Sequence, residues 1–409
     1  MNKKNEIREW PYPYISGLAI SNDAEYMSFE ILESLMEFLN TKNKTILGKG
    51  LNLEITTSIF HYSDKNYNCS IFNGLAVNSP PSKNASRLSE YLSNGFIDTL
   101  HAYGDFDNSG GFTRDHALKC FEHLNKINAK VSIFTNHGDS HNLQNIGIDG
   151  KYHKGDIKNN SAYHSDLLKS ANIKFVWTDS MIYENFLKDK KSFRENISKF
   201  KNKITNFNNK KYFSGNEISL IKQIKLQDRN NFYGFRRFRG TGSNAPNLSS
   251  LKLQLDQINW NDFYNKRQGI IIYQHLGVLN RINGKCYPLS FEDLKNKPEI
   301  FLEPFYFLSE ESKKGLLWVT GCDRFLSYLL MIKQINSINY DNGRININYK
   351  KYVQEPIKEF QGLTIYIDPI NFKGLFYNKI PIPIVLNRPD ENGLHSVSVP
   401  LKKLPSIWN

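Results

Sequence analysis

The chain has 409 residues, of which 40% are hydrophobic and 13% aromatic, and this composition excludes an intrinsically disordered protein. Its net charge of +13 would suit a nucleic-acid-binding protein. However, the lysines are spread through Asn-rich segments, and neither a zinc-finger spacing nor an RNA-binding signature is present. We therefore expect no nucleic-acid partner, and the charge favours an acidic glycan or a peripheral contact with an anionic membrane surface.

The expected location follows from cysteine use and apolar runs. The four cysteines are scattered and form no Cys-x-x-Cys pair, which argues against a Cys-ligated zinc site and fits a reducing compartment. Residues 1–13 contain no apolar signal region, and no run reaches the roughly 18 apolar residues that a membrane-spanning helix needs. These features predict a cytoplasmic protein.

Short apolar runs alternate with helical patterns through most of the chain. Strands are expected at residues 17–20, 53–60, 96–100, 130–135, 174–178, 232–238, 269–273 and 316–319. Helices are expected at residues 29–39, 113–127, 163–171 and 323–332. This alternation predicts an α/β protein with βα units and a parallel sheet, and the number of units predicts a deformed (β/α)7-8 barrel over residues 1–335.

The pattern changes after about residue 335. Short strand patterns at residues 338–352, 363–367 and 380–385 are separated by turn sequences, among them Asp341-Asn342-Gly343. We therefore expect a small β-rich C-terminal domain over residues 336–409.

Polar residues follow four of the predicted strands at their carboxyl ends. They are, in chain order, Asn22 with Asp23, His101 with Asp105, His137 with His141, and His275. Because the carboxyl ends of parallel strands meet on one face, these side chains are expected to converge. Imidazoles and carboxylates are ligands of zinc, and a catalytic site leaves one position for a water whose pKa falls to about 7. A histidine taken alone is more often an ordinary hydrogen-bonded group than a ligand, so the metal interpretation depends on the whole set.

The layout resembles the polysaccharide deacetylase superfamily (NodB-like, carbohydrate esterase family four). It is most similar to a divergent branch associated with bacterial surface-polysaccharide genes. The resemblance covers about residues 15–335 and depends on the order of its motifs: Asn22-Asp23, Asn136-His137-Gly138-Asp139-Ser140-His141, and His275 after an apolar strand. The segments shared with the branch lie at residues 101–106, 136–142, 163–166, 176–177 and 318–320.

The resemblance implies a metal-dependent hydrolase that removes N- or O-acetyl groups from a bacterial surface polysaccharide or its lipid-linked precursor. Carried over residue by residue, the metal ligands are Asp23, His137 and His141, and Zn²⁺ is the expected ion. His275 takes the position of the general acid that protonates the leaving group. His101 is kept as a fourth ligand or a substrate contact.

The chain departs from the family at two points. The general-base aspartate of the family corresponds to Asn22, and an amide cannot accept a proton at neutral pH. A substitute carboxylate is needed, and the candidates are Glu25, Asp105 and Asp139. The histidine pair also follows the fourth strand instead of the third, so the metal set could include His101 with Asp105.

Further residues are candidates for substrate binding. They are Tyr103, Asn142, His164 and the arginines Arg236, Arg237 and Arg239. The arginines could clamp a phosphate or a carboxylate, or form a solvated basic edge. His164 opens a helix, where a histidine is more often a structural or capping partner than a site residue. Tyr103, Trp177 and Trp318 could stack on sugar rings, although core packing also explains a tryptophan in a buried strand.

A second hypothesis follows from the amide at Asn22. The barrel could be catalytically divergent and bind a glycan, or cleave glycosidic bonds with the paired carboxylates Glu25 and Asp105. Such a pair would need a separation of about 5–9.5 Å. Release of acetate, as against a new reducing end, separates the two hypotheses.

Overall fold

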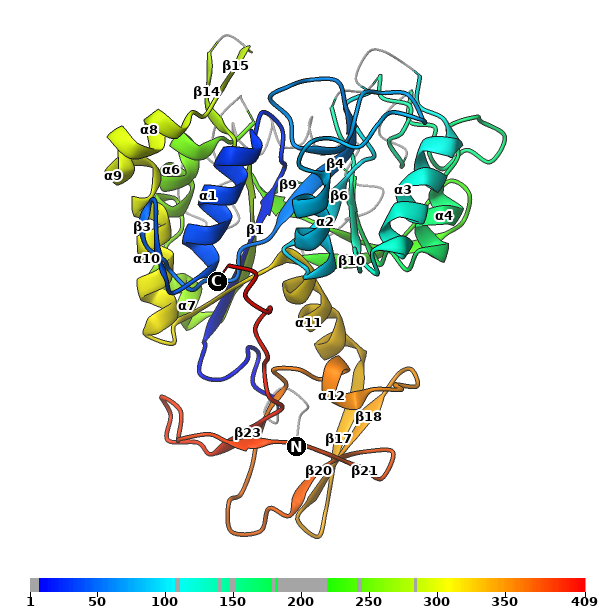
Figure 1. Cartoon of the computed structure of the whole chain (residues 1–409). Helices are drawn as coiled ribbons and strands as arrows, with labels where there is room; N and C mark the ends of the chain where they lie inside the picture. Colours follow the sequence, from blue (N-terminus) through cyan, green and yellow to red (C-terminus); the bar gives the residue numbers. More distant parts are fainter. Residues whose placement is uncertain are drawn as a thin grey trace, which may run out of the picture.

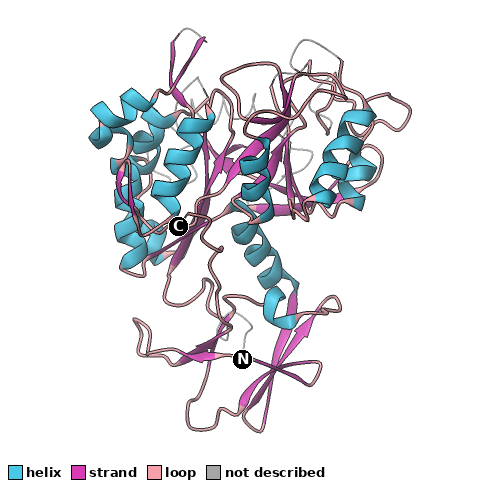
Figure 2. Cartoon of the chain, in the orientation of Figure 1, coloured by secondary structure: helices cyan, strands magenta, loops and turns pink. Residues whose placement is uncertain are grey.

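The computed structural model describes residues 7–106, 111–138, 141–147, 152–178, 181–182, 219–240, 245–282 and 285–408. These residues form a mixed α/β structure with several sheets (Figures 1 and 2). Figure 1 shows a larger unit of strands and helices, from which helix α11 (Cys322–Gln334) leads into a smaller unit built mainly of strands. None of the described helices is both long enough and apolar enough to cross a membrane.

One sheet of the larger unit has five strands, all of them parallel to their neighbours. In spatial order they are β16 (Leu317–Thr320), β1 (Ser16–Asn22), β13 (Gly269–Gln274), β12 (Arg237–Phe238) and β9 (Met181–Ile182). Every residue of β1 is buried, as expected for a parallel strand covered on both faces.

The second sheet has seven strands and is parallel except where β10 pairs with β11. In spatial order they are β10 (Ile221–Lys225), β11 (Asn231–Phe235), β8 (Phe175–Trp177), β7 (Ile133–Thr135), β6 (Ile97–His101), β4 (Thr57–Ser63) and β5 (Ser70–Asn73). Strands β11 and β12 come from the single strand expected at residues 232–238. They belong to different sheets, so that expectation was wrong.

The two sheets meet at two places. Strands β8 and β9 are consecutive in the chain and lie one in each sheet. On the other side, β1 reaches β4 through side chains: Asn22 Nδ2 donates to Thr57 Oγ1 at 2.7 Å, and the Ala24 N–H donates to Ser58 Oγ at 3.1 Å. The backbone ladders of the described strands form separate sheets, so the closed barrel stays a prediction.

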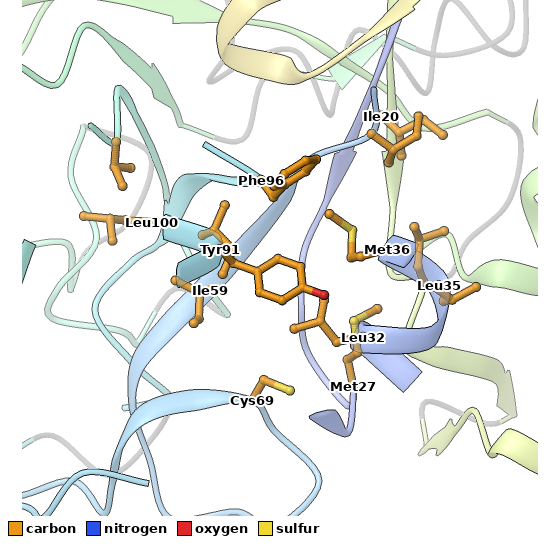
Figure 3. Close-up of a cluster of buried hydrophobic side chains, with 14 of the residues drawn as sticks. Ile20, Met27, Leu32, Leu35, Met36, Ile59, Cys69, Tyr91, Phe96 and Leu100 are labelled. Atoms are coloured by element: carbon orange, nitrogen blue, oxygen red, sulfur yellow. The ribbon is translucent and has the colours of Figure 1, made fainter. Parts of the chain in front are cut away.

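Helices flank these sheets. Their bounds are α1 (Phe29–Asn40), α2 (Ala85–Ser93), α3 (Arg114–Lys126), α4 (Ser165–Ser170), α6 (Leu251–Asp256), α7 (Trp260–Asn265), α8 (Phe291–Asn296), α9 (Pro298–Phe301) and α10 (Glu303–Lys313). Helix α1 shows why they form: Ser28 caps its N-terminus, and apolar residues recur every three or four positions. Figure 3 shows Leu32, Leu35 and Met36 of this helix in one buried cluster with Tyr91. Burying each such side chain contributes about 1.5–3 kcal/mol.

The smaller unit contains two sheets. One has the order β17 (Ile335–Asp341), β18 (Arg344–Tyr349), β20 (Gly374–Tyr377) and β21 (Ile380–Ile382), and the other has β19 (Thr364–Tyr366), β23 (Ser396–Ser398) and β22 (Val385–Leu386). A short helix, α12 (Pro356–Glu359), lies between β18 and β19 in the chain. The change expected near residue 335, from alternating strands and helices to short strands, falls where α11 runs directly into β17.

Segments near the two chain ends link the units. Ile7 forms a bridge with Ile365, and the buried Arg8 pairs with Asp390 at 3.0 Å, so this early segment lies against the smaller unit. The last described residues run back to the larger unit (Figure 1). There the Trp408 ring packs 4.7 Å from the ring of Phe96.

Candidate metal centre

Five ionisable side chains meet at the carboxyl ends of four strands. Asp23 and Glu25 follow β1, His101 ends β6, His137 follows β7, and His275 follows β13. All are buried except Glu25, whose side chain is 17% exposed. The sequence places them here because parallel strands bring their carboxyl ends to the same face.

The centre of the cluster is the Glu25 carboxylate. Its Oε1 lies 3.1 Å from Nε2 of His101 and 3.1 Å from Nε2 of His137. One ligand atom from each of these three residues lies within 4.8 Å of the others. Tetrahedral zinc with bonds of 2.0–2.2 Å spaces its ligand atoms about 3.4 Å apart. The three side chains therefore fit a divalent ion with little rearrangement.

Hydrogen bonds and ring contacts fix the two imidazoles. His101 Nδ1 lies 2.8 Å from Thr135 Oγ1, which leaves Nε2 facing Glu25. The His101 ring stacks on Phe60, and the His137 ring meets the same Phe60 edge-on. A partner on the second ring nitrogen, as Thr135 provides, is what orients a metal-binding histidine.

The His137 backbone is held by the loop that follows it. Asn142 Nδ2 and Asn145 Nδ2 each donate to the His137 carbonyl at 2.9 Å, and the His137 N–H donates to Asn145 Oδ1 at 2.9 Å. Gly138 has a left-handed φ of 71°, which turns the chain directly after His137. The loop therefore presents a single imidazole to the site.

Asp23 is bound to Arg237. Arg237 Nη1 donates to Asp23 Oδ1 at 2.7 Å and to Ser21 Oγ at 3.2 Å. The guanidinium lies between two rings, 3.4 Å from the centre of Trp177 and 3.9 Å from that of Tyr273. Burial raises the pKa of Asp23, but the charges of Arg237, His101 and His275 outweigh it, and the pKa lies below its usual value. Asp23 is therefore ionised at neutral pH.

The pKa values of the central groups suit metal ligands. Burial raises the pKa of Glu25, but the charge of His137 and hydrogen bonds from His101, His137 and His275 hold it well below its usual value. Burial lowers the pKa of His101 despite the nearby carboxylates. A metal ligand must be a carboxylate or a neutral imidazole, and these shifts favour those states for Glu25 and His101.

His275 faces the same carboxylate from the end of β13, the strand that pairs with β1. Its Nδ1 lies 2.7 Å from the Pro246 carbonyl, so that nitrogen carries the proton. Its Nε2 lies 3.8 Å from Glu25 Oε1 and 3.4 Å from the Tyr273 hydroxyl. Nε2 is therefore the nitrogen available to the site.

Asn22 joins the two sheets. It donates to Thr57 on β4, and its Oδ1 accepts from the Leu276 N–H at 2.7 Å. An aspartate could accept the second of these bonds but could not donate the first. The amide therefore has a structural role at the position where the family has its base.

The structure does not bring every predicted metal or base residue to the cluster. His141 is exposed, and its ring lies 4.4 Å from that of Tyr152. Residues four apart share a face on a helix, whereas here a loop follows His137, so the paired-histidine expectation is replaced by His137 with His101. Asp105 pairs with Lys65 at 2.5 Å. Asp139 lies outside the described residues.

The predicted substrate contacts are mostly buried. The Tyr103 hydroxyl lies 2.9 Å from His164 Nδ1, and both side chains are enclosed by aromatic rings such as Phe112. Asn142 is buried on the His137 carbonyl, and Arg237 is buried on Asp23. These buried side chains leave no surface for a sugar: Asn142 and Arg237 hold residues of the site, and Tyr103 and His164 pack in the core.

Arg281 was missed by reading the sequence. Its Nη2 lies 3.8 Å from Glu25 Oε2. One signal was available: Asn283-Gly284, a dipeptide typical of tight hairpin turns, comes shortly after His275. Such a hairpin starts at the site and can fold over it.

Comparison with known proteins does not assign the chain to a family. No protein-family model, curated protein or solved structure matches the chain. The support for a function therefore consists of the geometry of the cluster and of the motif resemblance.

Proposed function

We propose that this chain is a metal-dependent hydrolase that removes N- or O-acetyl groups from a bacterial surface polysaccharide or its lipid-linked precursor. The observation that carries the proposal is the carboxylate of Glu25 within 3.1 Å of two imidazoles, those of His101 and His137. Zn²⁺ is the proposed ion, because one carboxylate and two imidazoles form a typical catalytic zinc set with a position left open.

The geometry supports an exchange of roles between the two carboxylates. Glu25, expected as a substitute base, faces both imidazoles and is the proposed ligand. Asp23, expected as a ligand, is bound to Arg237 and is the proposed base. Bound there, a divalent ion supplies a Lewis acid for the acyl carbonyl and lowers the pKa of water to about 7.

Asp23 and His275 would move the protons. Arg237 keeps Asp23 ionised, so its carboxylate can accept the proton of the attacking water. The Pro246 carbonyl holds the Nδ1 proton of His275, so a second proton on Nε2 faces the site and can pass to the leaving group. An amine departs poorly without a proton, so removal of an N-acetyl group needs His275 more than removal of an O-acetyl group does.

Glycoside cleavage by Glu25 and Asp105 remains the alternative prediction. The observed contacts favour it less. Asp105 is bound to Lys65 and Asn68, whereas Glu25 lies among imidazoles. A glycosidase needs both carboxyls beside the glycosidic bond, whereas Asp105 is buried in its ion pair with Lys65.

The test is metal content and acetate release in a matched pair of histidine variants. The wild-type chain should bind about one zinc ion and release acetate from an acetylated oligosaccharide. His101→Ala should lose both properties, because it removes a ligand of the central cluster. His141→Ala should keep both, because His141 is exposed beside Tyr152.

Two outcomes would contradict the proposal. The proposed metal centre fails if the wild-type chain binds no ion after dialysis against zinc. The ligand set fails if His141→Ala loses the ion while His101→Ala retains it. A new reducing end without acetate would favour the glycosidase alternative.

A further inference from the structure

A β-hairpin stands beside the candidate metal centre. It consists of β14 (Val278–Ile282) and β15 (Lys285–Pro288), which pair antiparallel, and it begins three residues after His275. Figure 1 shows it projecting from the larger unit at the end away from the smaller unit. The proposed general acid and the hairpin therefore belong to one continuous segment.

The hairpin is docked next to Glu25. Arg281 lies opposite Cys286 in the hairpin register, and the Cys286 thiol is hydrogen-bonded to the Tyr26 hydroxyl. Tyr26 directly follows Glu25, and its ring stacks on Tyr67 with 4.8 Å between ring centres. These contacts hold the base of the Arg281 side chain beside the central carboxylate.

The Arg281 guanidinium makes fewer polar contacts with the protein than its N–H donors allow. Its Nη2 is 3.8 Å from Glu25 Oε2, which is an ion pair but too long for a hydrogen bond. Its Nε is buried, and it has no hydrogen-bond partner in the part of the chain that the structure describes. A buried donor left without an acceptor costs free energy, which an incoming anion can recover.

The second arginine at the site differs in its access. Arg237 pairs with Asp23 and, among the described residues, also has buried N–H groups without a partner, but it is enclosed between Trp177 and Tyr273. The Arg281 side chain is 16% exposed. Arg281 is therefore the guanidinium that a ligand can reach.

We propose that the substrate carries an anionic group close to its acetyl group, and that Arg281 binds this group. This inference depends on the proposed deacetylase function and deepens it by naming the substrate class: an acetylated sugar bearing a carboxylate or a phosphate. The planar fork of a guanidinium matches the oxygens of either group. The carboxylates of Asp23 and Glu25 already face two guanidiniums, so a divalent ion would leave a surplus of positive charge for an anionic ligand to balance.

The experiment compares three probes that share one acetamido sugar. They are N-acetylglucosamine, its uronate and its 1-phosphate, and acetate release is measured for each. The wild-type chain should have a higher kcat/KM for one charged probe than for the neutral sugar. The uronate and phosphate arms show which anion the site prefers. Calorimetric binding of the same probes to the same protein is the second readout.

The variants separate recognition from structure. Arg281→Gln should lower kcat/KM for the preferred anion about 10- to 100-fold more than for the neutral sugar, since a hydrogen bond to a charged group is lost. Arg281→Lys should restore part of the preference by charge alone. Lys285→Gln is the control, because it removes the same charge from an exposed position on the same hairpin.

Each outcome supports or overturns the inference. Equal loss for charged and neutral probes in Arg281→Gln would mean that Arg281 only supports Glu25, and the inference would be wrong while the deacetylase function stood. If no probe yields acetate, the proposed function is in doubt, and binding decides the inference. Anion binding that weakens in Arg281→Gln but not in Lys285→Gln supports it, and identical binding overturns it.

Discussion

The larger unit contains two pairs of histidines on opposite faces of one strand, β4; all four are buried except the half-buried His123. Phe60 of β4 contacts the rings of His101 and His137. The next residue, His61, points to the other face, where its Nε2 lies 3.3 Å from Nδ1 of His123 on α3. Successive side chains of a strand face opposite sides, so adjacent positions bring one residue to the site and the other to a helix.

The two pairs consist of the same side chains but have different neighbours. Glu25 joins His101 and His137, whereas among the described residues no carboxylate completes the second pair into a group of metal ligands. Burial lowers the pKa of His61 to about 3, with the neighbouring His123 adding to the effect. Burial also lowers the pKa of His123, so this imidazole pair without a countercharge is a neutral packing element, and the carboxylate makes the other pair a candidate centre.

The sharpest test of this comparison removes the carboxylate. Glu25→Gln keeps the size of the side chain but loses its charge, so we expect the bound ion to be lost and acetate release to fall at least about 10³-fold. His123→Gln alters the other pair and should leave both properties unchanged. Elemental analysis and an acetate assay on both variants provide the measurement. An ion that persists in Glu25→Gln would remove the distinction between the pairs.

The next effect concerns His275, the proposed proton donor, which follows β13 in the sheet that does not contain β4. His275→Gln should lower the rate of N-acetyl removal about 10²- to 10⁴-fold while the ion stays bound. The loss should be smaller for an O-acetyl substrate, because an alkoxide leaves more readily than an amine anion. Equal losses on matched amide and ester substrates would argue that His275 holds the site in shape and transfers no proton.

Arg237 provides another difference between the two histidine pairs, because it belongs to the candidate centre that contains His101 and His137. It keeps Asp23 ionised beside the first pair, and Arg237→Gln would leave that buried carboxylate without its main partner. We expect a loss of about 3–5 kcal/mol in the free energy of unfolding, measured by urea denaturation.

A double variant provides the control for Arg237. Asp23→Asn with Arg237→Gln removes both charges and should regain part of the lost stability. It should release no acetate, because the proposed base is gone. If the single and double variants are equally unstable, the packing of Arg237 between Trp177 and Tyr273 matters more than its ion pair.

Part of this arrangement could be predicted from the sequence. The apolar runs expected at residues 17–20 and 269–273 fall within β1 and β13, and the chemistry-bearing residues Asp23 and His275 follow them directly. Local signals suffice here, because a buried parallel strand is a continuous apolar run and the residue after it is placed by the strand.

The ligand assignments were less predictable. The pairing of His137 with His141 followed the motif of the resembled family, but the loop bonds from Asn142 and Asn145 present only His137. The split at Arg236, which sends β11 and β12 to different sheets, has no local signal either. Such features depend on contacts between distant segments, which one sequence does not reveal.

The smallest expected effect tests the second pair through pH. In the unfolded chain an imidazole has a pKa of about 6.5, whereas the folded chain holds His61 at about 3. The unfolded state therefore takes up this proton first as the pH falls. The titration of His61 therefore leaves the free energy of unfolding unchanged above pH 6.5. Between about pH 6.5 and 3 it lowers that free energy by up to about 1.4 kcal/mol per pH unit.

His61→Gln removes that titration, so its unfolding free energy should fall less steeply than that of the wild type between pH 6.5 and 5, as measured by urea denaturation at each pH. His395→Gln, an exposed histidine of the smaller unit, should follow the wild-type curve. A His61→Gln curve parallel to the wild type would mean that His61 is charged in the folded state. The second pair would then need a countercharge of its own, and the contrast between the two faces of β4 would disappear.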